Sequence, residues 1–361
     1  MSILYFIVVL FVIVLVHEWG HYKTAKLFDV RVDEFGFGYP PKIATLFKRG
    51  ETSFTLNALP FGGFVKIYGE DAVEGSHDIS RALFKKPKWQ QALILFAGVF
   101  MNIVLAWVIF LFLFLSNSPV VGSYVPKEYV SNERVVITDV VPGASADTGG
   151  VKKGDEVLSV TVGNEVTQVD SSYMFTDLIQ TSYGEPVIVT VSRDTQEMSL
   201  TVTPLENEGS YKVGVGLTTI GDIDVPIGKA ILYSFQVIGQ IISDIFSGLY
   251  QLIRSLFIRG DGASVEVSGP VGIVKTIGDA SRYGIEYLLS LTALISLNLA
   301  VLNILPIPAL DGGRLLFLLI EKIKGKPINI KTATIIHATS FFILVGLMLL
   351  VTVFDVFKLF R

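Results

Sequence analysis

The sequence predicts a polytopic α-helical membrane protein with four transmembrane helices, a membrane-associated β-hairpin, one soluble extracytoplasmic domain and an amphipathic helix. Of the 361 residues, 51% are hydrophobic and only 17% are charged, whereas soluble chains are about 25% charged. Several apolar runs approach the roughly 20 residues that a helix needs to cross a bilayer. A long middle stretch instead alternates strand-like segments with glycine turns.

Four apolar runs are predicted to span the bilayer. The first, residues 3–16, is too short alone and spans only if its helix continues to about residue 28. A signal peptide is the alternative, but no basic segment precedes the run and no small-residue cleavage site follows it. The other runs are residues 92–115, 285–305 and about 335–354.

Basic residues near the spans predict the topology. Lysines at 85, 86 and 88 precede the second run, and five basic residues lie between the third and fourth runs. Both loops should therefore be cytoplasmic. Both termini and residues 116–284 are then extracytoplasmic. The predicted location of the protein is the cytoplasmic (inner) membrane of a bacterium.

The middle region divides into a soluble domain and an amphipathic helix. Residues 135–141 and 187–191 have strand-like patterns between glycine turns. Within residues 227–258, polar side chains recur at steps of three and four, which predicts a helix on a membrane surface rather than a span. We therefore divide the chain into residues 1–118, 119–222, 223–283 and 284–361.

The charge and cysteine counts limit the partners and the chemistry. A formal net charge of −4 provides no basic field, which excludes nucleic acid. The chain has no cysteine, so a metal site must use carboxylates and the four histidines, His17, His21, His77 and His337.

The segment His17-Glu18-Trp19-Gly20-His21 has the H-E-x-x-H pattern. On a helix, His17 and His21 face the same way and can bind one ion, while Glu18 is placed to take a proton from a metal-bound water. Ionisable groups within a span cost about 2.5–3.5 kcal/mol each, which favours a functional role. A polar helix end whose side chains reach the interface is the alternative.

Catalytic zinc usually has a third protein ligand, and Asp311 is the candidate at the depth of the histidines. It follows the third run, where Pro306 and Pro308 must end the helix. We expect irregular backbone through Gly312 and Gly313, which is tolerated at membrane depth only where it is buried or lines a cavity. A helix-capping aspartate is the alternative reading.

The two segments around His17 and Asp311 resemble the site-2 protease family of intramembrane zinc metalloproteases, of the bacterial regulator-of-sigma-E protease type. The resemblance implies Zn²⁺ bound by His17, His21 and Asp311, with Glu18 as the general base. It also implies that Asn303 helps to hold the substrate backbone. Asn102 and Gly98 match a family pattern in the second span, for which we favour helix packing.

Residues 33–38 and 53–67 form a glycine-rich β-hairpin by pattern and resemble the family's membrane-dipping β-loop. Free strand edges in this loop could pair with an unwound substrate, so Gly62, Gly63 and Phe64 are candidate substrate-binding residues. A purely structural hairpin is the alternative.

Residues 140–147 and 150–160 resemble a PDZ domain, and residues 120–220 leave room for one. It would bind peptide ends or filter substrates by size. His77 lies in a polar loop and is predicted to be a solvated residue. His337 is predicted to be a residue at the edge of a span.

These observations predict an intramembrane zinc endopeptidase with its active site towards the cytoplasm. The resemblance implies single-span membrane substrates already trimmed by another protease, such as an anti-sigma factor or signal-peptide remnants. The alternatives are a non-catalytic PDZ scaffold with a structural metal, and a zinc peptidase that cuts soluble peptides outside the membrane.

Overall fold

The computed structural model describes residues 1–70, 79–116, 118–121, 127–193, 195–207, 209–257, 269–281, 284–326 and 328–359. They form two compact units. The helical unit comprises Met1–Phe110 and Ile238–Phe360, and the sheet unit comprises Leu111–Val237. His77, read as a solvated loop residue, lies outside the described residues.

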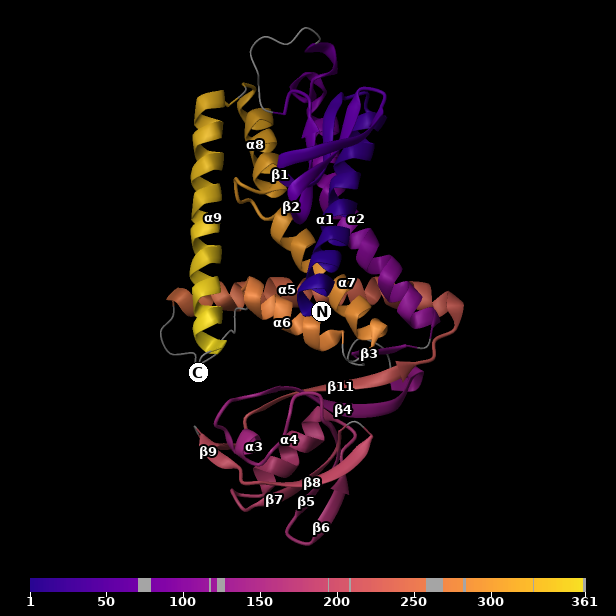
Figure 1. The fold of residues 1–361 in the computed structure, drawn as a ribbon, viewed down its shortest axis with the longest axis vertical. Coiled ribbons are helices and arrows are strands. Elements are labelled where there is room, and N and C mark those ends of the chain that lie inside the picture. Colours follow the sequence, from indigo (N-terminus) through magenta and orange to yellow (C-terminus); the bar gives the residue numbers. More distant parts are fainter. Residues whose placement is uncertain are drawn as a thin grey trace. The chain divides into compact units, whose positions relative to one another are not determined.

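Long apolar helices dominate the helical unit (Figure 1). The four predicted runs correspond to α1 (Ser2–Leu27), α2 (Lys88–Leu115), α7 (Ile285–Ile304) and α9 (Ile330–Leu359). α1 continues without a break through the histidine pair, so its 26 residues give a length of about 39 Å. The predicted extension of the first run is therefore confirmed.

The amphipathic segment forms one helix, α5 (Ile227–Phe257). Val237, Ile238 and Ile241 are buried, whereas the whole polar stripe is exposed: Gln236, Gln240, Ser243, Asp244, Ser247, Gln251 and Arg254. Within the described residues, five helices are long and apolar enough to cross a membrane, and residues Ile227–Ser255 of α5 are among them. Length and composition alone therefore do not decide between a span and a surface helix.

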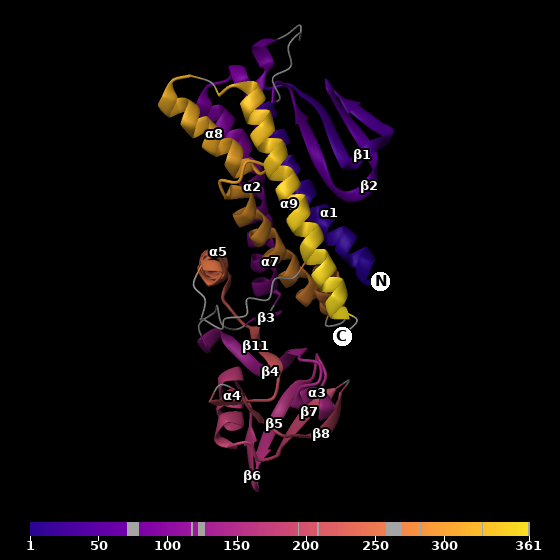
Figure 2. The same ribbon diagram turned by 90° about the vertical axis from the view of Figure 1, so that its left-hand side faces the viewer.

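The predicted hairpin is confirmed as β1 (Val32–Arg49) and β2 (Thr52–Ile67), which lie against α1 (Figure 2). Residues 34–37 occupy the middle, because they pair with residues 53–56 on one side and 63–66 on the other. Phe35 lies 5.7 Å from Tyr22 of α1 and 5.3 Å from Phe54, measured between ring centroids. This buried aromatic cluster fixes the hairpin to the helix that carries the histidines.

The proline-rich segment after α7 interrupts the helix as predicted. Helix α7 ends at Ile304, and α8 (Asp311–Lys324) begins with the aspartate itself. The expectation of irregular backbone through Gly312 and Gly313 is wrong, because both lie in the first turn of α8. A Cβ on either glycine would lie 2.2 Å from a carbonyl oxygen of residues 304, 305 or 307, so their small size allows this turn to pack on the preceding segment.

Helix α6 (Pro270–Ala280) was not anticipated from the sequence. Its Gly272 N–H donates a 2.9 Å hydrogen bond to the carboxylate of Asp355 in α9. Short 3₁₀ turns, η1 (Ile79–Arg81) and η2 (Leu83–Lys85), precede α2.

A seven-stranded antiparallel sheet forms the sheet unit, with the order β3-β11-β4-β5-β7-β8 and β6 paired to β5. The strands are β3 (Pro119–Val121), β4 (Val130–Val140), β5 (Glu156–Val162), β6 (Glu165–Gln168), β7 (Val187–Arg193), β8 (Gln196–Val202) and β11 (Val215–Ile223); β9 (Leu205–Asn207) and β10 (Ser210–Lys212) form a separate pair, and α3 (Ser145–Thr148) and α4 (Ser172–Thr181) are the helices. Both predicted strand segments are thus confirmed, in β4 and β7.

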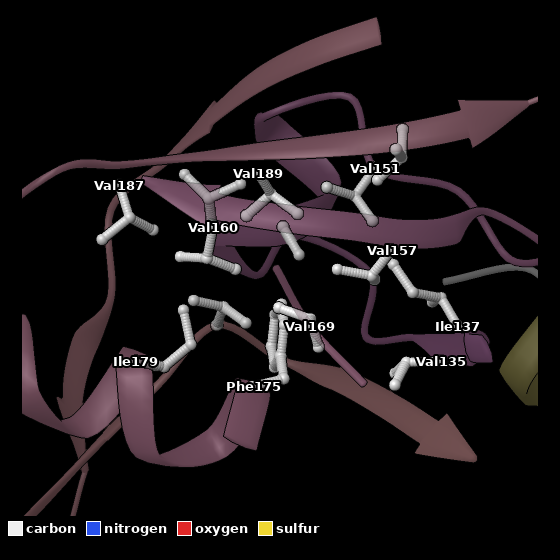
Figure 3. Close-up of a cluster of buried hydrophobic side chains, with 14 residues drawn as sticks. Val135, Ile137, Val151, Val157, Val160, Val169, Phe175, Ile179, Val187 and Val189 are labelled. Carbon is white, nitrogen blue, oxygen red and sulfur yellow. The ribbon is translucent and has the colours of Figure 1, made fainter. Parts of the chain in front are cut away.

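The core of the sheet unit is made largely of valines (Figure 3). Val160, Val187 and Val189 from the middle strands meet Phe175 and Ile179 of α4. Burial of this face explains the alternation along β7, where every second residue from Val187 to Val191 is buried. The unit therefore has its own hydrophobic core.

Candidate metal centre

Helix α1 places the two histidines of the H-E-x-x-H segment side by side. The Nε2 atoms of His17 and His21 are 3.1 Å apart, and the ring centroids are 4.8 Å apart. The exposed fraction is only 6% for His17 and 7% for His21. The spacing of four residues therefore produces a pair of imidazoles that point to one buried position.

Asp311 meets this pair from the first turn of α8. Its Oδ2 atom is 3.1 Å from Nε2 of His17 and 3.4 Å from Nε2 of His21. Among the described residues, these three form the single group of histidine, aspartate and glutamate side chains whose donor atoms converge as metal ligands would. The fold therefore brings the three predicted residues together, although Asp311 is almost 300 positions from the histidines in the sequence.

The outer nitrogen of each imidazole has its own partner. Nδ1 of His21 lies 2.8 Å from the backbone oxygen of Ile94, so Nδ1 carries the proton and Nε2 keeps its lone pair. Nδ1 of His17 lies 3.3 Å from the side-chain amide of Asn102. The amide atom next to Nδ1 is Nδ2, and the buried Oδ1 atom of Asn102 has no hydrogen-bond partner. Placing this oxygen towards Nδ1 satisfies both groups and leaves Nε2 of His17 free to accept.

Gly98 of α2 lies directly against the two histidines. A Cβ at this position would be 2.3 Å from Nε2 of His21 and 2.7 Å from Nε2 of His17. We predicted that Gly98 and Asn102 serve helix packing. Gly20 fits that role better, because a Cβ at Gly20 would lie 2.3 Å from the backbone oxygen of Ala97. Gly98 and Asn102 lie four residues apart on one face of α2, and both face the histidines.

Glu18 lies between the histidine helix and the hairpin. The backbone N–H of Val65 donates a hydrogen bond to its carboxylate. A Cβ on Gly63 would approach the Glu18 side chain to 3.9 Å. Burial raises the pKa of the Tyr39 phenol, and the negative charge of Glu18 raises this pKa further. The structure thus places β2 beside the glutamate of the motif.

The other predicted site residues are less closely grouped. Gly62 has φ +90° and faces Val14 and Tyr39, and the ring of Phe64 covers Gly36. Asn303 is half-buried in the last turn of α7. His337 contacts Phe317, with ring centroids 5.0 Å apart, and is not one of the three converging donors.

Comparison with known proteins identifies the family. The family model for peptidase family M50 matches residues 5–347. The chain belongs to peptidase family M50.

Three relatives agree with this assignment along the whole chain. A candidate zinc metalloprotease of Clostridium perfringens is 36% identical, with 99% of this chain and 98% of the relative covered. Another, from Fusobacterium nucleatum, is 32% identical over the full length of both chains. The zinc metalloprotease RasP of Geobacillus kaustophilus is 29% identical, with 99% and 98% covered.

Membership of this family confirms the resemblance to the site-2 proteases and makes the protein an intramembrane zinc metalloendopeptidase. The converging donors fit the zinc of an M50 peptidase. Oδ2 of Asp311 is buried and has no hydrogen-bond donor, while both imidazoles direct an Nε2 lone pair towards it. Three acceptor atoms that face one another without a proton require a cation between them. Two imidazoles and one carboxylate are a usual ligand set for catalytic zinc.

Proposed function

We propose that His17, His21 and Asp311 hold the zinc ion and that Glu18 is the general base for hydrolysis of a peptide bond. The observation that carries the proposal is the position of Glu18. Its carboxylate is next to the converging donors and is also hydrogen-bonded to the backbone of β2. A base in this place can reach both a water molecule and a peptide strand.

Each residue has a defined task in this reaction. When bound, zinc acidifies a water molecule and polarises the scissile carbonyl. Glu18 accepts the proton released from that water and delivers it to the nitrogen of the leaving amine. Ile94 and Asn102 hold the two imidazoles in the tautomer that keeps Nε2 unprotonated.

The edge of β2 is the proposed position of the substrate strand. Residues 63–67 pair with residues 32–37 on one side, and on the other side they pair with no described segment. Because the backbone of Val65 in this strand is hydrogen-bonded to Glu18, a substrate segment that unwinds and adds to this edge would pass the base. Gly63 leaves room for its close approach. Gly62 and Phe64 shape this edge, and Asn303 would hold the other side of the strand.

We further propose four spans, with both termini and a PDZ-like sheet unit on the extracytoplasmic side of a bacterial inner membrane. The exposed polar stripe of α5 supports a surface helix, and the basic residues between α7 and α9 support cytoplasmic placement of α8. The substrates would then be single-span proteins, trimmed beforehand so that they pass the sheet unit.

The scaffold alternative is less consistent with the site. Structural zinc sites are closed by four protein ligands, and among the described residues three donors converge. An incomplete protein shell leaves a position for water, as hydrolysis requires.

The test is Glu18→Gln in the full-length protein, with zinc content and cleavage of a model single-span substrate measured on one preparation. Glutamine has nearly the same shape, so we expect zinc to stay bound. Loss of a general base lowers the rate about 10²–10⁴-fold, and the same group also protonates the leaving amine, so the loss should lie near the upper limit. A zinc-loaded variant that keeps more than about a tenth of the rate would exclude Glu18 as the base.

A further inference from the structure

We propose that the ion pair between Glu70 and Arg314 is a positioning pair for this protease, which fixes the spacing between the open edge of β2 and Asp311. This inference rests on the proposed function, because it concerns the space in which the substrate strand would lie. Neither residue forms a described hydrogen bond or ion pair with the three converging donors or with Glu18, although the charge of Arg314 acts on Glu18 at longer range, so both are positioning residues.

Arg314 is rigidly connected to Asp311. It lies three residues further along α8, on the same side of the first turn. Its backbone N–H donates to the oxygen of Leu310, the residue just before Asp311. The close contacts of Gly312 and Gly313 with the preceding carbonyls leave this turn little freedom. A displacement of the Arg314 side chain would therefore also displace the Asp311 carboxylate.

Glu70 is connected as tightly to the edge strand. Its N–H donates to the oxygen of Ile67, the last residue of β2, across a tight turn in which Gly69 has φ +73°. Tyr68 is held by backbone hydrogen bonds to Arg31 and Leu83 on either side. The side chain of Glu70 thus extends from the end of the strand whose Val65 N–H binds Glu18.

The ion pair closes a ring of contacts around the proposed reaction site. A guanidinium nitrogen of Arg314 contacts a carboxylate oxygen of Glu70, and the side chains are 36% and 20% exposed. From Glu70 the ring runs through residues 63–67 to Glu18, along α1 to His17 and His21, and through Asp311 back to Arg314. This is the direct side-chain link between the edge strand and α8 among the described ion pairs.

A second ion pair of α8 provides the matched control. Lys88, at the start of α2, pairs with Glu321, which lies about two turns beyond Arg314. Its side chains are 41% and 16% exposed, similar to those of the first pair. It holds α8 as well but does not connect to the edge strand. Removing it should affect the anchoring of α8 without changing the spacing at Glu18.

The experiment compares Arg314→Gln, Glu70→Gln, the double variant and Lys88→Gln in the full-length zinc-loaded protein. We expect each to bind one zinc ion. A displacement of about 1 Å can cost about 10²-fold in rate, so kcat should fall about 10–100-fold in either single variant of the positioning pair. KM should change less than about threefold, since an interaction that acts only in the transition state lowers kcat and kcat/KM together.

Three further results belong to the test. The double variant should be no worse than the poorer single variant, because both remove one link. Arg314→Lys should keep more of the rate than Arg314→Gln, and Lys88→Gln should stay within about twofold of wild type.

The proposal is overturned by wild-type kcat in both single variants, by additive losses in the double variant, by an equal loss in Lys88→Gln, or by loss of zinc. If one variant does not fold, the other tests the pair from its opposite end. Failure of the proposed function would be seen separately, as a Glu18→Gln protein that still cleaves.

Discussion

Replacing Gly98 with alanine adds one methyl group at the point where the three donors converge. The new Cβ would lie 2.3 Å from Nε2 of His21 and 2.7 Å from both Cε1 and Nε2 of His17. Ordinary contact needs at least 3.4 Å, so the closest approach is too short by about 1 Å. We expect Gly98→Ala to lose zinc and, with it, activity.

The surroundings cannot relieve this overlap cheaply. Each imidazole is held at Nδ1, by the oxygen of Ile94 or by the amide of Asn102. Moving either ring breaks a buried hydrogen bond, and moving α2 away disturbs its contact with Gly20 of α1. Overpacking of this kind costs about 1–3 kcal/mol. Changes behind a ligand weaken metal binding about 10–100-fold, so a change that displaces two ligands should exceed about 100-fold, or about 2.7 kcal/mol.

The assay is zinc affinity of the purified protein by competition with a chelator, together with cleavage of a single-span substrate. Gly346→Ala is the matched control, since Gly346 is an exposed helix glycine of α9 with nothing within 4 Å of its added Cβ. The control should keep both zinc and activity. A Gly98→Ala protein that binds zinc with wild-type affinity would show that position 98 does not face the ion and that the site geometry is wrong.

The other predictions concern ligands, support and access. Asp311→Ala should abolish stoichiometric zinc in elemental analysis, whereas His337→Ala should keep zinc and activity; the opposite pattern would reject Asp311 as the third ligand. Asn102→Leu should weaken zinc about 10–100-fold in a chelator titration, and unchanged affinity would show that Nδ1 of His17 needs no partner. Deleting residues 120–220 should speed cleavage of substrates with a bulky outer domain while short substrates are still cut; equal rates for both on the intact protein would argue against a size filter.

The positions of the long apolar helices and of the three converging side chains followed from the sequence because each rests on a local physical rule. A bilayer sets the length of an apolar run, and the helical repeat sets the spacing of His17 and His21. Asp311 was inferred from depth and from the prolines before it, which end α7. The details of that turn were missed because glycine predicts flexibility, whereas Gly312 and Gly313 serve here as small residues within a helix.

The support of the site could not be predicted, because it depends on which faces of the helices meet. Asn102 and Asn298 both interrupt apolar runs, and the hydropathy pattern alone does not distinguish them. In the structure, Asn298 is exposed, and its side-chain amide donates a 2.9 Å hydrogen bond to the backbone oxygen of Leu294 in the same helix. Asn102 is fully buried and contacts His17. The difference is a matter of rotation about the helix axis, which only tertiary packing determines.

Three buried polar residues, one from each of three apolar helices, form one connected set. His17 of α1 contacts the side chain of Asn102 in α2, whose backbone oxygen accepts a 2.9 Å hydrogen bond from Ser296 of α7. A polar group without a partner is costly in an apolar environment, so each of these residues would destabilise its helix alone. Together they fix the relative rotation of α1, α2 and α7. The packing that satisfies these polar groups is therefore the same packing that directs both Nε2 atoms to Asp311, and folding of the membrane unit already aligns the proposed ligands.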